Sequence, residues 1–545
     1  MEGRRIDPER EKEYRARGYW TNDTLLDRWE RAVAAYGARE FVCDDLGRRC
    51  TYADMDRMAD AFAAHLETAG IRQGEVVSFQ ITPRYEFLVV LFGCLKLGAI
   101  PAPLGLCFID RELRELLIKL KSRLHVSVSA YRGEDRSAEM CSVARQLPQL
   151  RELIFVGGSL GTGDYIGFDF DEIVETGGSP LRRSRAKSGD IGLILCTSGT
   201  TKGSKAVLFT HRSVIFSEES FNRAYELTGD DAIFMPAPLN HATGLHHGII
   251  SPLLRGGRLV LQERFNCREA VALMNREGCT YSMGATPFVY DIVKSLEETG
   301  ASLPKLRFYI SGGAPVPAEL VKTAWVRHGI LVCECYGSTE SVPHVGVRPA
   351  ECLQGMGRWS GRAMDGIEVR VVDKDRRPVA PGTVGEEASR GPNMFSAYLG
   401  APELTDEALD EDGWFYSGDL CVADENGNIK IVGRIKDIIV RGGENLNSND
   451  ISDNLDGCPG VVDHAVIGMP DERLGERICA FVVTDGTVVT KESVVNYLRT
   501  KRVQKRLWPE RIEQIDAIPR TDSGKVKKNV LADVLADRMK GKKTC

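Results

Sequence analysis

Apolar and polar positions in the first part of the chain change repeatedly between helical and strand periodicity. Residues 51–70 (TYADMDRMADAFAAHLETAG) show helical apolar spacing, start at a plausible N-cap threonine and end at a glycine. Residues 76–81 then favour a strand, residues 86–97 a helix closed by Gly98, and residues 99–104 a further strand interrupted by prolines. This alternation of strand and helix predicts a parallel sheet in an α/β fold.

Further apolar runs follow, and each leads into a turn or a polar loop. They cover residues 191–196, 258–261, 306–310 and 331–336. In open α/β sheets ligands gather at the carboxyl ends of the strands. We therefore expect the glycine- and hydroxyl-rich loops 197–205, 311–315 and 337–340 to converge on one crevice.

The pattern changes after residue 366. Short strands joined by Asp, Gly and Asn turns indicate a smaller β-rich subdomain, with strands at 367–373, 385–390 and 428–432. Strands around 438–440, 465–469 and 478–483 and a helix at 491–499 then predict a compact α+β unit. The interpretation is a large domain over residues 1–433, a junction at 434–436 and a small domain over 437–545.

Composition limits the functional classes. A chain of 545 residues is too long for one ordinary core, and 43% hydrophobic and 27% charged residues fit a globular α/β enzyme. The net charge of −6 argues against nucleic-acid binding. The longest apolar run, residues 87–95, is too short for a membrane span, and the charged N-terminus lacks a secretory signal. We expect a cytoplasmic enzyme, with its oligomeric state open.

The fifteen cysteines are scattered, without the paired C-x-x-C spacing of a zinc site. Small buried hydrophobic side chains in a reducing compartment are the favoured interpretation. We assign these cysteines no chemistry.

The segment Leu195–Lys205 (LCTSGTTKGSK) is the most informative stretch of the chain. It joins hydroxyls, glycines and lysines directly after an apolar run. Small residues let backbone N–H groups approach an anion, and lysine adds a positive charge. The segment therefore predicts a loop that binds phosphate.

Four motifs occur in order along the chain. They are TSGTTKGSK (197–205), YGSTE (336–340), YSGDL (416–420) with GRIKD (433–437), and PRTDSGK (519–525). Together they resemble the adenylate-forming superfamily, which includes acyl- and aryl-CoA ligases, luciferases and the adenylation domains of peptide synthetases. The resemblance runs from about Leu25 to the final helix, and the ordered set is specific although each motif alone is weak.

Three further segments look most like short- to medium-chain fatty-acyl-CoA and alicyclic-carboxylate-CoA ligases. They are PAPLNHATGLHHG (236–248), GATPFVYD (284–291) and EEASRGPNMF (386–395). The resemblance implies that a carboxylate attacks the α-phosphorus of ATP and that CoA thiol then displaces AMP. Its cofactors would be ATP/AMP, Mg²⁺ and CoA, and a small C-terminal domain would move between the two steps.

The resemblance also implies roles on the nucleotide side. Tyr336 would stack on adenine, Thr339 would donate to the α-phosphate and Glu340 would hold Mg²⁺. A strand followed by a capped helix would be the interpretation of YGSTE without the other motifs. The other residues implied to hold the nucleotide are Thr197, Ser198, Gly199, Thr200, Thr201, Lys205, Gly312, Gly313, Ala314 and Gly337.

On the C-terminal side, Asp419 would take the ribose hydroxyls with help from Arg434, and Lys525 would neutralise charge during adenylation. Lys436 matches the family's hinge position, and Gly442-Gly443 its passage for the pantetheine arm. Taken alone, Asp419 would be assigned to a turn, Lys525 would be a solvated lysine, and Gly442-Gly443 would form a hairpin turn.

His241, Thr286 and Phe288 are the candidates for the acyl pocket. A structural histidine is an alternative for His241 and is the favoured interpretation for the pair at 246–247. Amino-acid-activating relatives carry an aspartate near this segment to bind the substrate ammonium. Residues 240–244 contain none, so an apolar acid is expected.

The phosphate loop departs from the family pattern TSGTTG-x-P-K-G. Lys202, Ser204 and Ala206 stand where the pattern has glycine, proline and glycine. A lysine that must adopt φ > 0 costs about 1 kcal/mol or more. Two hypotheses about the function therefore remain. The chain is either a complete two-step ligase, or an enzyme confined to thioester formation from acyl adenylate that a separate adenylating enzyme supplies.

Two other functions remain as alternatives. An acyl-AMP ligase would load a carrier protein in place of CoA. A non-enzymatic nucleotide sensor is disfavoured because Glu340, Asp419, Arg434 and Lys525 are retained.

Overall fold

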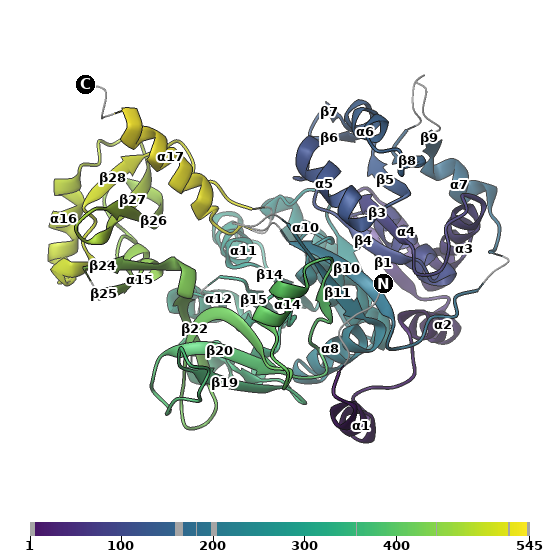
Figure 1. Ribbon diagram of the computed structural model, residues 1–545, viewed down its shortest axis with the longest axis horizontal. Helices are drawn as coiled ribbons and strands as arrows, with labels where there is room; N and C mark the ends of the chain where they lie inside the picture. The colour runs from purple at the N-terminus through teal and green to yellow at the C-terminus, as the bar shows by residue number, and fades with distance from the viewer. Residues whose placement is uncertain are drawn as a thin grey trace. The chain divides into compact units, whose positions relative to one another are not determined.

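The computed structural model describes residues 6–158, 167–180, 183–197, 204–314, 316–355, 357–442, 444–521 and 524–541 (Figure 1). The chain divides into two compact units. The first extends to Val369 and also takes in Ser389–Phe415, and the second comprises Arg370–Ala388 and the chain from Tyr416 onward. The junction at 434–436 lies inside the second unit and stays a prediction about which segment moves.

The first unit is built around a mostly parallel nine-stranded sheet. Its strands, in spatial order, are β18 (Arg362–Ala363), β17 (Val345–Gly346), β16 (Leu331–Tyr336), β15 (Phe308–Gly312), β14 (Tyr281–Gly284), β12 (Ala232–Met235), β13 (Arg258–Leu261), β1 (Glu40–Asp44) and β2 (Arg49–Thr51). All pairs from β16 to β1 are parallel, and the edge strands β2, β17 and β18 pair antiparallel. The loops after β15 and β16 therefore leave the same edge.

Helices connect the strands of this sheet. They are α8 (His211–Ala224), the π-helix η1 (Thr243–Ile250), α9 (Ser251–Arg255), α10 (Cys267–Glu277), α11 (Thr286–Thr299) and α12 (Ala318–His328). Their apolar faces join the main hydrophobic core, which confirms the predicted α/β class.

A second, fully parallel sheet holds the N-terminal part of the chain. Its order is β4 (Ile100–Pro103), β3 (Val76–Gln80), β5 (Leu124–Val128), β8 (Glu152–Val156) and β9 (Gly167–Asp169). Its helices are α3 (Tyr52–Thr68), α4 (Tyr85–Leu97), α5 (Asp110–Leu120), α6 (Arg136–Arg145) and α7 (Phe170–Thr176). Every residue of α4 is buried, as its apolar sequence requires, and Gly98 ends it in the left-handed conformation.

The run at 191–196 lies outside both parallel sheets. It forms β10 (Ile191–Thr197), which pairs antiparallel with β11 (Lys205–Thr210), and β21 (Ala397–Tyr398) pairs antiparallel with β11. The connection between β10 and β11 is too short for the dozen or more residues of a parallel crossover. The predicted phosphate loop therefore joins two strands of a hairpin.

The second unit contains two sheets. The first has the order β19 (Glu368–Val372), β20 (Gly385–Arg390), β22 (Phe415–Ala423), β23 (Ile429–Arg434). The second has the order β25 (Glu444–Asn447), β24 (Ile438–Arg441), β27 (Gly475–Thr484), β26 (Val461–Asp471), and β28 (Arg511–Gln514) pairs with β27. Its helices are α15 (Ser448–Asp453), α16 (Lys491–Thr500) and α17 (Lys528–Gly541). These elements confirm the predicted β-rich subdomain and small α+β unit.

Successive residues of β27 face opposite cores. Ile478, Ala480 and Val482 pack in one apolar cluster with side chains of α15 and α16, whereas Cys479 and Phe481 pack in another with α17. This alternation follows from the two-residue period of a strand.

Within the described ranges, no helix combines the length and the apolar character needed to cross a bilayer.

The fold of the first unit depends on a neutral buried histidine. His211 begins α8 and is 4% exposed, and its Nδ1 accepts a hydrogen bond from the Leu25 N–H at 3.3 Å. Burial lowers the pKa of His211 to about 4. Because histidine in an unfolded chain titrates near about 6.5, the stability from the neutral form is present above that pH and is lost as the pH falls through about 4.

We expect this residue to remove about 3 kcal/mol from the free energy of unfolding between about pH 6.5 and 4. Urea unfolding at a series of pH values measures how steeply the free energy of unfolding changes with pH. The wild type is compared with His211→Gln, whose amide oxygen still accepts a hydrogen bond. Parallel slopes for the two proteins would show that His211 is not the titrating group.

Candidate active site

Three side chains from distant parts of the first unit meet beside the predicted phosphate loop. Lys205 opens β11, Tyr398 belongs to β21 and Glu340 follows β16. The Tyr398 hydroxyl donates to Glu340 Oε1 at 2.6 Å, and Lys205 Nζ lies 3.2 Å from that hydroxyl and 3.9 Å from Glu340 Oε1. The expected convergence of loops 197–205 and 337–340 is therefore confirmed for Lys205 and Glu340.

The loops after β15 and β16 depend on close backbone approach. A Cβ on Gly312 would lie 2.7 Å from Cys335 Sγ, and a Cβ on Gly337 would lie 2.3 Å from the Val342 carbonyl oxygen. Gly313 has φ +83°, which a side chain would strain. Packing thus requires glycine at positions 312 and 337, and backbone conformation favours glycine at 313, beside any role in binding a nucleotide.

Tyr336 ends β16, where it is 9% exposed and its ring contacts His344 with centroids 5.5 Å apart. Thr339 follows in the same loop and is partly exposed. Ala314 ends the described part of the β15 loop, and its carbonyl oxygen accepts from Thr286 Oγ1 at 3.4 Å. Adenine stacking and phosphate binding by this group remain predictions.

Thr286 and Phe288 begin α11, directly after β14. Thr286 Oγ1 lies 3.1 Å from Ser311 Oγ, so this threonine joins α11 to the β15 loop. Phe288 packs edge-on against Phe265, with ring centroids 4.9 Å apart. Thr286 is buried and Phe288 is partly buried, and their role toward an acyl group stays a prediction.

His241 directly precedes the turn that leads into η1. Its carbonyl oxygen accepts from the Leu245 N–H at 2.9 Å, and its Nδ1 lies 3.4 Å from the Thr243 N–H. π-Helical turns are rare and occur frequently at functional sites. The segment that carries His241 is therefore held in an unusual backbone conformation.

Gly244 lies in this segment and packs closely against the backbone before it. A Cβ at Gly244 would lie 2.2 Å from the Pro238 carbonyl oxygen and 2.8 Å from Leu239 Cα, both of them backbone atoms. We expect Gly244→Ala to lower the free energy of unfolding by about 1–3 kcal/mol, since overpacking there forces the backbone to move. Chemical denaturation measures this loss.

Gly248→Ala, in the same π-helix, is the matched control. Its Cβ would meet the flexible Met235 side chain, with Cγ at 3.0 Å. An equal loss in the two variants would contradict the backbone explanation.

A buried acid lies behind the π-helix. Glu218 on α8 lies 2.9 Å from His247 Nδ1 and 3.5 Å from His246 Nδ1, and all three side chains are fully buried. Burial raises the pKa of Glu218, but the two neighbouring imidazoles outweigh burial and lower this pKa to about 2. This arrangement gives the two histidines a structural environment, in line with the sequence interpretation.

In the second unit, Asp419 and Arg434 face each other across the β22–β23 pair. Asp419 is 6% exposed, and its Oδ1 lies 2.9 Å from Arg434 Nε. Gly418 adopts φ +73°, and its N–H donates to Glu386 Oε1 at 2.9 Å. These contacts fix the part of β22 that presents the Asp419 carboxylate, so this residue lies in a strand and not in a turn.

Lys525 lies in a turn held by two hydrogen bonds with Thr521. The Thr521 N–H donates to the Lys525 carbonyl oxygen at 2.8 Å, and the Lys525 N–H donates to Thr521 Oγ1 at 3.1 Å. Both of these bonds use the backbone of Lys525. Lys436 lies in the short helix Ile435–Asp437, and Asp437 is anchored by Lys528 Nζ at 3.0 Å.

Several predicted residues lie outside the described part of the chain: Ser198, Gly199, Thr200, Thr201, Lys202 and Gly443. Of the predicted pantetheine passage, Gly442 is described. It has φ +61° at the turn between β24 and β25, which suits the hairpin that was the alternative interpretation.

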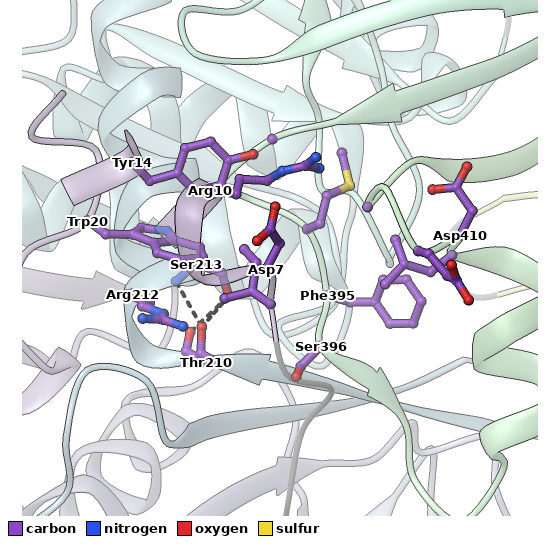
Figure 2. A pocket seen from close by; sticks show the side chains of 16 residues that line it. Asp7, Arg10, Tyr14, Trp20, Thr210, Arg212, Ser213, Phe395, Ser396 and Asp410 are labelled. Atoms are coloured by element: carbon purple, nitrogen blue, oxygen red, sulfur yellow. Dashed lines mark hydrogen bonds between the residues drawn. The ribbon is translucent and has the colours of Figure 1, made fainter. Parts of the chain in front are cut away.

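Figure 2 shows a pocket that contains none of the predicted residues. It lies between α1 (Pro8–Ala16), the start of α8 and the segment 391–396. Arg212 lies over the Trp20 ring at 3.9 Å and pairs with Glu11 at 2.7 Å, and Trp20 Nε1 donates to the Pro392 carbonyl oxygen. The N-terminal helix is thus tied to the segment that leads into β21.

Sequence reasoning missed Tyr398. It also missed Asn393, whose Nδ2 donates to the Ser341 carbonyl oxygen at 2.5 Å, and Lys528 beside the short helix Ile435–Asp437. A buried asparagine and a tyrosine in a two-residue strand carry no local pattern that separates them from ordinary turn and core residues.

Comparison with known proteins decides the family. Residues 29–399 match the family "AMP-binding enzyme", and residues 451–525 match "AMP-binding enzyme C-terminal domain". The chain belongs to the AMP-binding enzyme family. It is 38% identical to the medium-chain fatty-acid–CoA ligase of Escherichia coli (strain K12), over 98% of this chain and 94% of that one.

Two other proteins resemble this chain over nearly its whole length. A dioxo-octahydro-indenyl-propanoyl:CoA ligase of Rhodococcus jostii (strain RHA1) is 30% identical, over 92% of this chain and 97% of that one. The ATP-bound crystal structure of MatB from Rhodopseudomonas palustris superposes with a TM-score of 0.84 at 26% identity, covering 95% of this chain and 99% of that one.

These findings confirm the prediction of an AMP-forming acid–thiol ligase, with ATP/AMP and CoA as cofactors and a carboxylic acid as substrate.

Proposed function

We propose that this AMP-binding enzyme converts a medium-length or alicyclic apolar carboxylic acid to its CoA thioester and performs both half-reactions itself. The observation that carries the proposal is the meeting of Lys205 with Glu340, because it links the exit of the phosphate loop to the carboxylate of YGSTE. A loop that had lost its function would not need this cationic partner at its end.

In the first step a substrate carboxylate oxygen attacks the α-phosphorus of ATP, and pyrophosphate leaves. Lys205 and Thr339 are assigned to phosphate oxygens, and Lys525 neutralises the charge that develops between carboxylate and phosphate. In the second step the CoA thiolate attacks the acyl carbonyl, and AMP leaves with the former carboxylate oxygen. Asp419 holds the ribose hydroxyls throughout.

A divalent cation fits the donor set at Glu340. Mg²⁺ is usually bound by one or two carboxylates together with substrate phosphates, and Glu340 offers one carboxylate with its side chain 12% exposed. Among the described residues, the cluster with metal-like spacing lies elsewhere, at Glu40, Cys43 and Glu277, where arginines already pair with both glutamates. When bound, Mg²⁺ would offset the charge of the triphosphate.

The preference for an apolar acid rests on two features. Residues 240–244 provide no carboxylate for a substrate ammonium, and Phe288, at the start of α11, forms an aromatic pair with Phe265. The relatives named for a medium-chain fatty acid and for an alicyclic propanoate support the same class.

Products identified by mass spectrometry test this proposal. The enzyme is incubated with ATP, Mg²⁺ and straight-chain acids of increasing length or alicyclic acids, with either CoA or a holo-carrier protein as acceptor. We expect acyl-CoA with apolar acids. Acylated carrier without acyl-CoA would favour the carrier-loading alternative, and acyl-CoA formed only from synthetic acyl adenylate would favour an enzyme of the second half-reaction.

A further inference from the structure

The short strand β21 connects two parts of the nucleotide site. The Ser396 and Leu399 N–H groups donate to carbonyl oxygens of β11, those of Leu208 at 2.7 Å and Ala206 at 2.8 Å. One residue earlier, the Phe395 N–H donates to the Glu340 carbonyl oxygen at 2.8 Å. The strand that leaves the phosphate loop and the loop after β16 are therefore held in register by one segment of five residues.

Tyr398 extends this link to the side chains. Its hydroxyl lies between Lys205 Nζ, at 3.2 Å, and Glu340 Oε1, at 2.6 Å, and Lys205 Nζ lies 4.4 Å from the centre of the Tyr398 ring. Its own N–H donates to Thr405 Oγ1 at 3.0 Å, which fixes the tyrosine from α14 (Pro402–Ala408).

The direction of each hydrogen bond is determined by chemistry. A phenol has one proton, an ammonium group only donates, and a carboxylate only accepts. Tyr398 thus accepts from Lys205 and donates to one oxygen of Glu340.

We propose that Tyr398 is a positioning residue that holds Oε1 of Glu340 and so directs the other carboxylate oxygen to the divalent cation of the nucleotide. This inference rests on the proposed metal role of Glu340. Without the hydroxyl, the carboxylate regains rotational freedom and can pair more closely with Lys205, which competes with the cation. A hydrogen bond to a charged group is among the stronger ones, so its loss has a measurable effect.

The test measures Mn²⁺ affinity by electron paramagnetic resonance in the presence of α,β-methylene ATP, which cannot be cleaved at the reacting bond. We expect Tyr398→Phe to weaken Mn²⁺ binding about tenfold, the low end for a hydrogen bond to a charged group. The unliganded thermal midpoint should change little, because the phenyl ring keeps its packing.

Tyr225→Phe is the matched control. Tyr225 is fully buried, and its hydroxyl has no hydrogen-bond partner among the described residues. We expect this variant to bind Mn²⁺ as the wild type does.

Unchanged Mn²⁺ affinity in Tyr398→Phe, or an equal loss in Tyr225→Phe, overturns the inference. The variant Glu340→Gln tests the metal role of Glu340, on which the positioning role of Tyr398 rests. If that variant retains wild-type Mn²⁺ affinity, Glu340 is not a metal ligand, and the metal role and the inference fail together. The ligase function is judged independently, by acyl-CoA production.

Discussion

Lys525→Ala is expected to lower the rate of acid-dependent pyrophosphate release about 10²- to 10³-fold, the cost typical of removing one donor that stabilises charge in a transition state. Thioester formation from synthetic acyl adenylate and CoA should stay within about twofold of wild type, because that step does not involve charge between a carboxylate and ATP. Stopped-flow detection of pyrophosphate and chromatography of acyl-CoA measure the two steps separately.

The structure makes this variant informative. The Lys525 backbone makes two hydrogen bonds with Thr521, and the substitution keeps both of these backbone groups. Lys527→Ala, two residues away, is the matched control and should affect neither step. Equal losses in both half-reactions for Lys525→Ala would show a general role in folding or binding.

Asp419→Asn is expected to slow both half-reactions by about two orders of magnitude, since hydrogen bonds to a charged group contribute about 1.5–3 kcal/mol each. The carboxylate is 6% exposed and paired with Arg434 at 2.9 Å, so the amide also leaves the guanidinium without its counter-charge. The affinity for AMP, measured by calorimetry, should fall in parallel.

Glu425→Gln provides the control for Asp419→Asn, because it changes an exposed acid in the same β22–β23 hairpin. Wild-type AMP affinity in Asp419→Asn would exclude the ribose as the ligand of this carboxylate. A loss in both variants would trace the effect to the hairpin as a whole.

Local signals in the sequence predicted the regular elements well. The helix at 51–70 is α3, where Thr51 and Asp54 form a capping box, and Gly98 ends α4 as its position indicated. The strands at 331–336 and 385–390 have the predicted ends. Each of these features depends on residues within one turn or one strand, so the sequence alone carries the information.

Features that depend on distant pairing were not predictable in this way. Periodicity alone did not separate the β10–β11 hairpin from a strand of the parallel sheet, since both contain the same buried apolar run. Tyr398 reaches Lys205 and Glu340 only because β21 pairs with β11. The π-helix that follows His241 includes Gly244, whose backbone lies too close to Pro238 for a side chain, and no helical pattern specifies this contact.

The residues whose roles are inferred by resemblance are divided between the two units. Lys205 and Glu340 lie near each other within one unit, whereas Asp419, Arg434 and Lys525 belong to the other, where each has a well-defined local environment. Lys202 lies outside the described residues, and acid-dependent release of pyrophosphate measures its effect on adenylation.

Transfer of an oxygen isotope tests the central claim most directly. The enzyme is given ATP, Mg²⁺, CoA and a medium-chain acid whose carboxylate carries ¹⁸O, and the products are analysed by mass spectrometry. If the chain forms the acyl adenylate itself, one ¹⁸O appears in AMP for each acyl-CoA made, and pyrophosphate stays unlabelled. Label in orthophosphate together with ADP, or absence of AMP and pyrophosphate while synthetic acyl adenylate still yields acyl-CoA, would contradict the account.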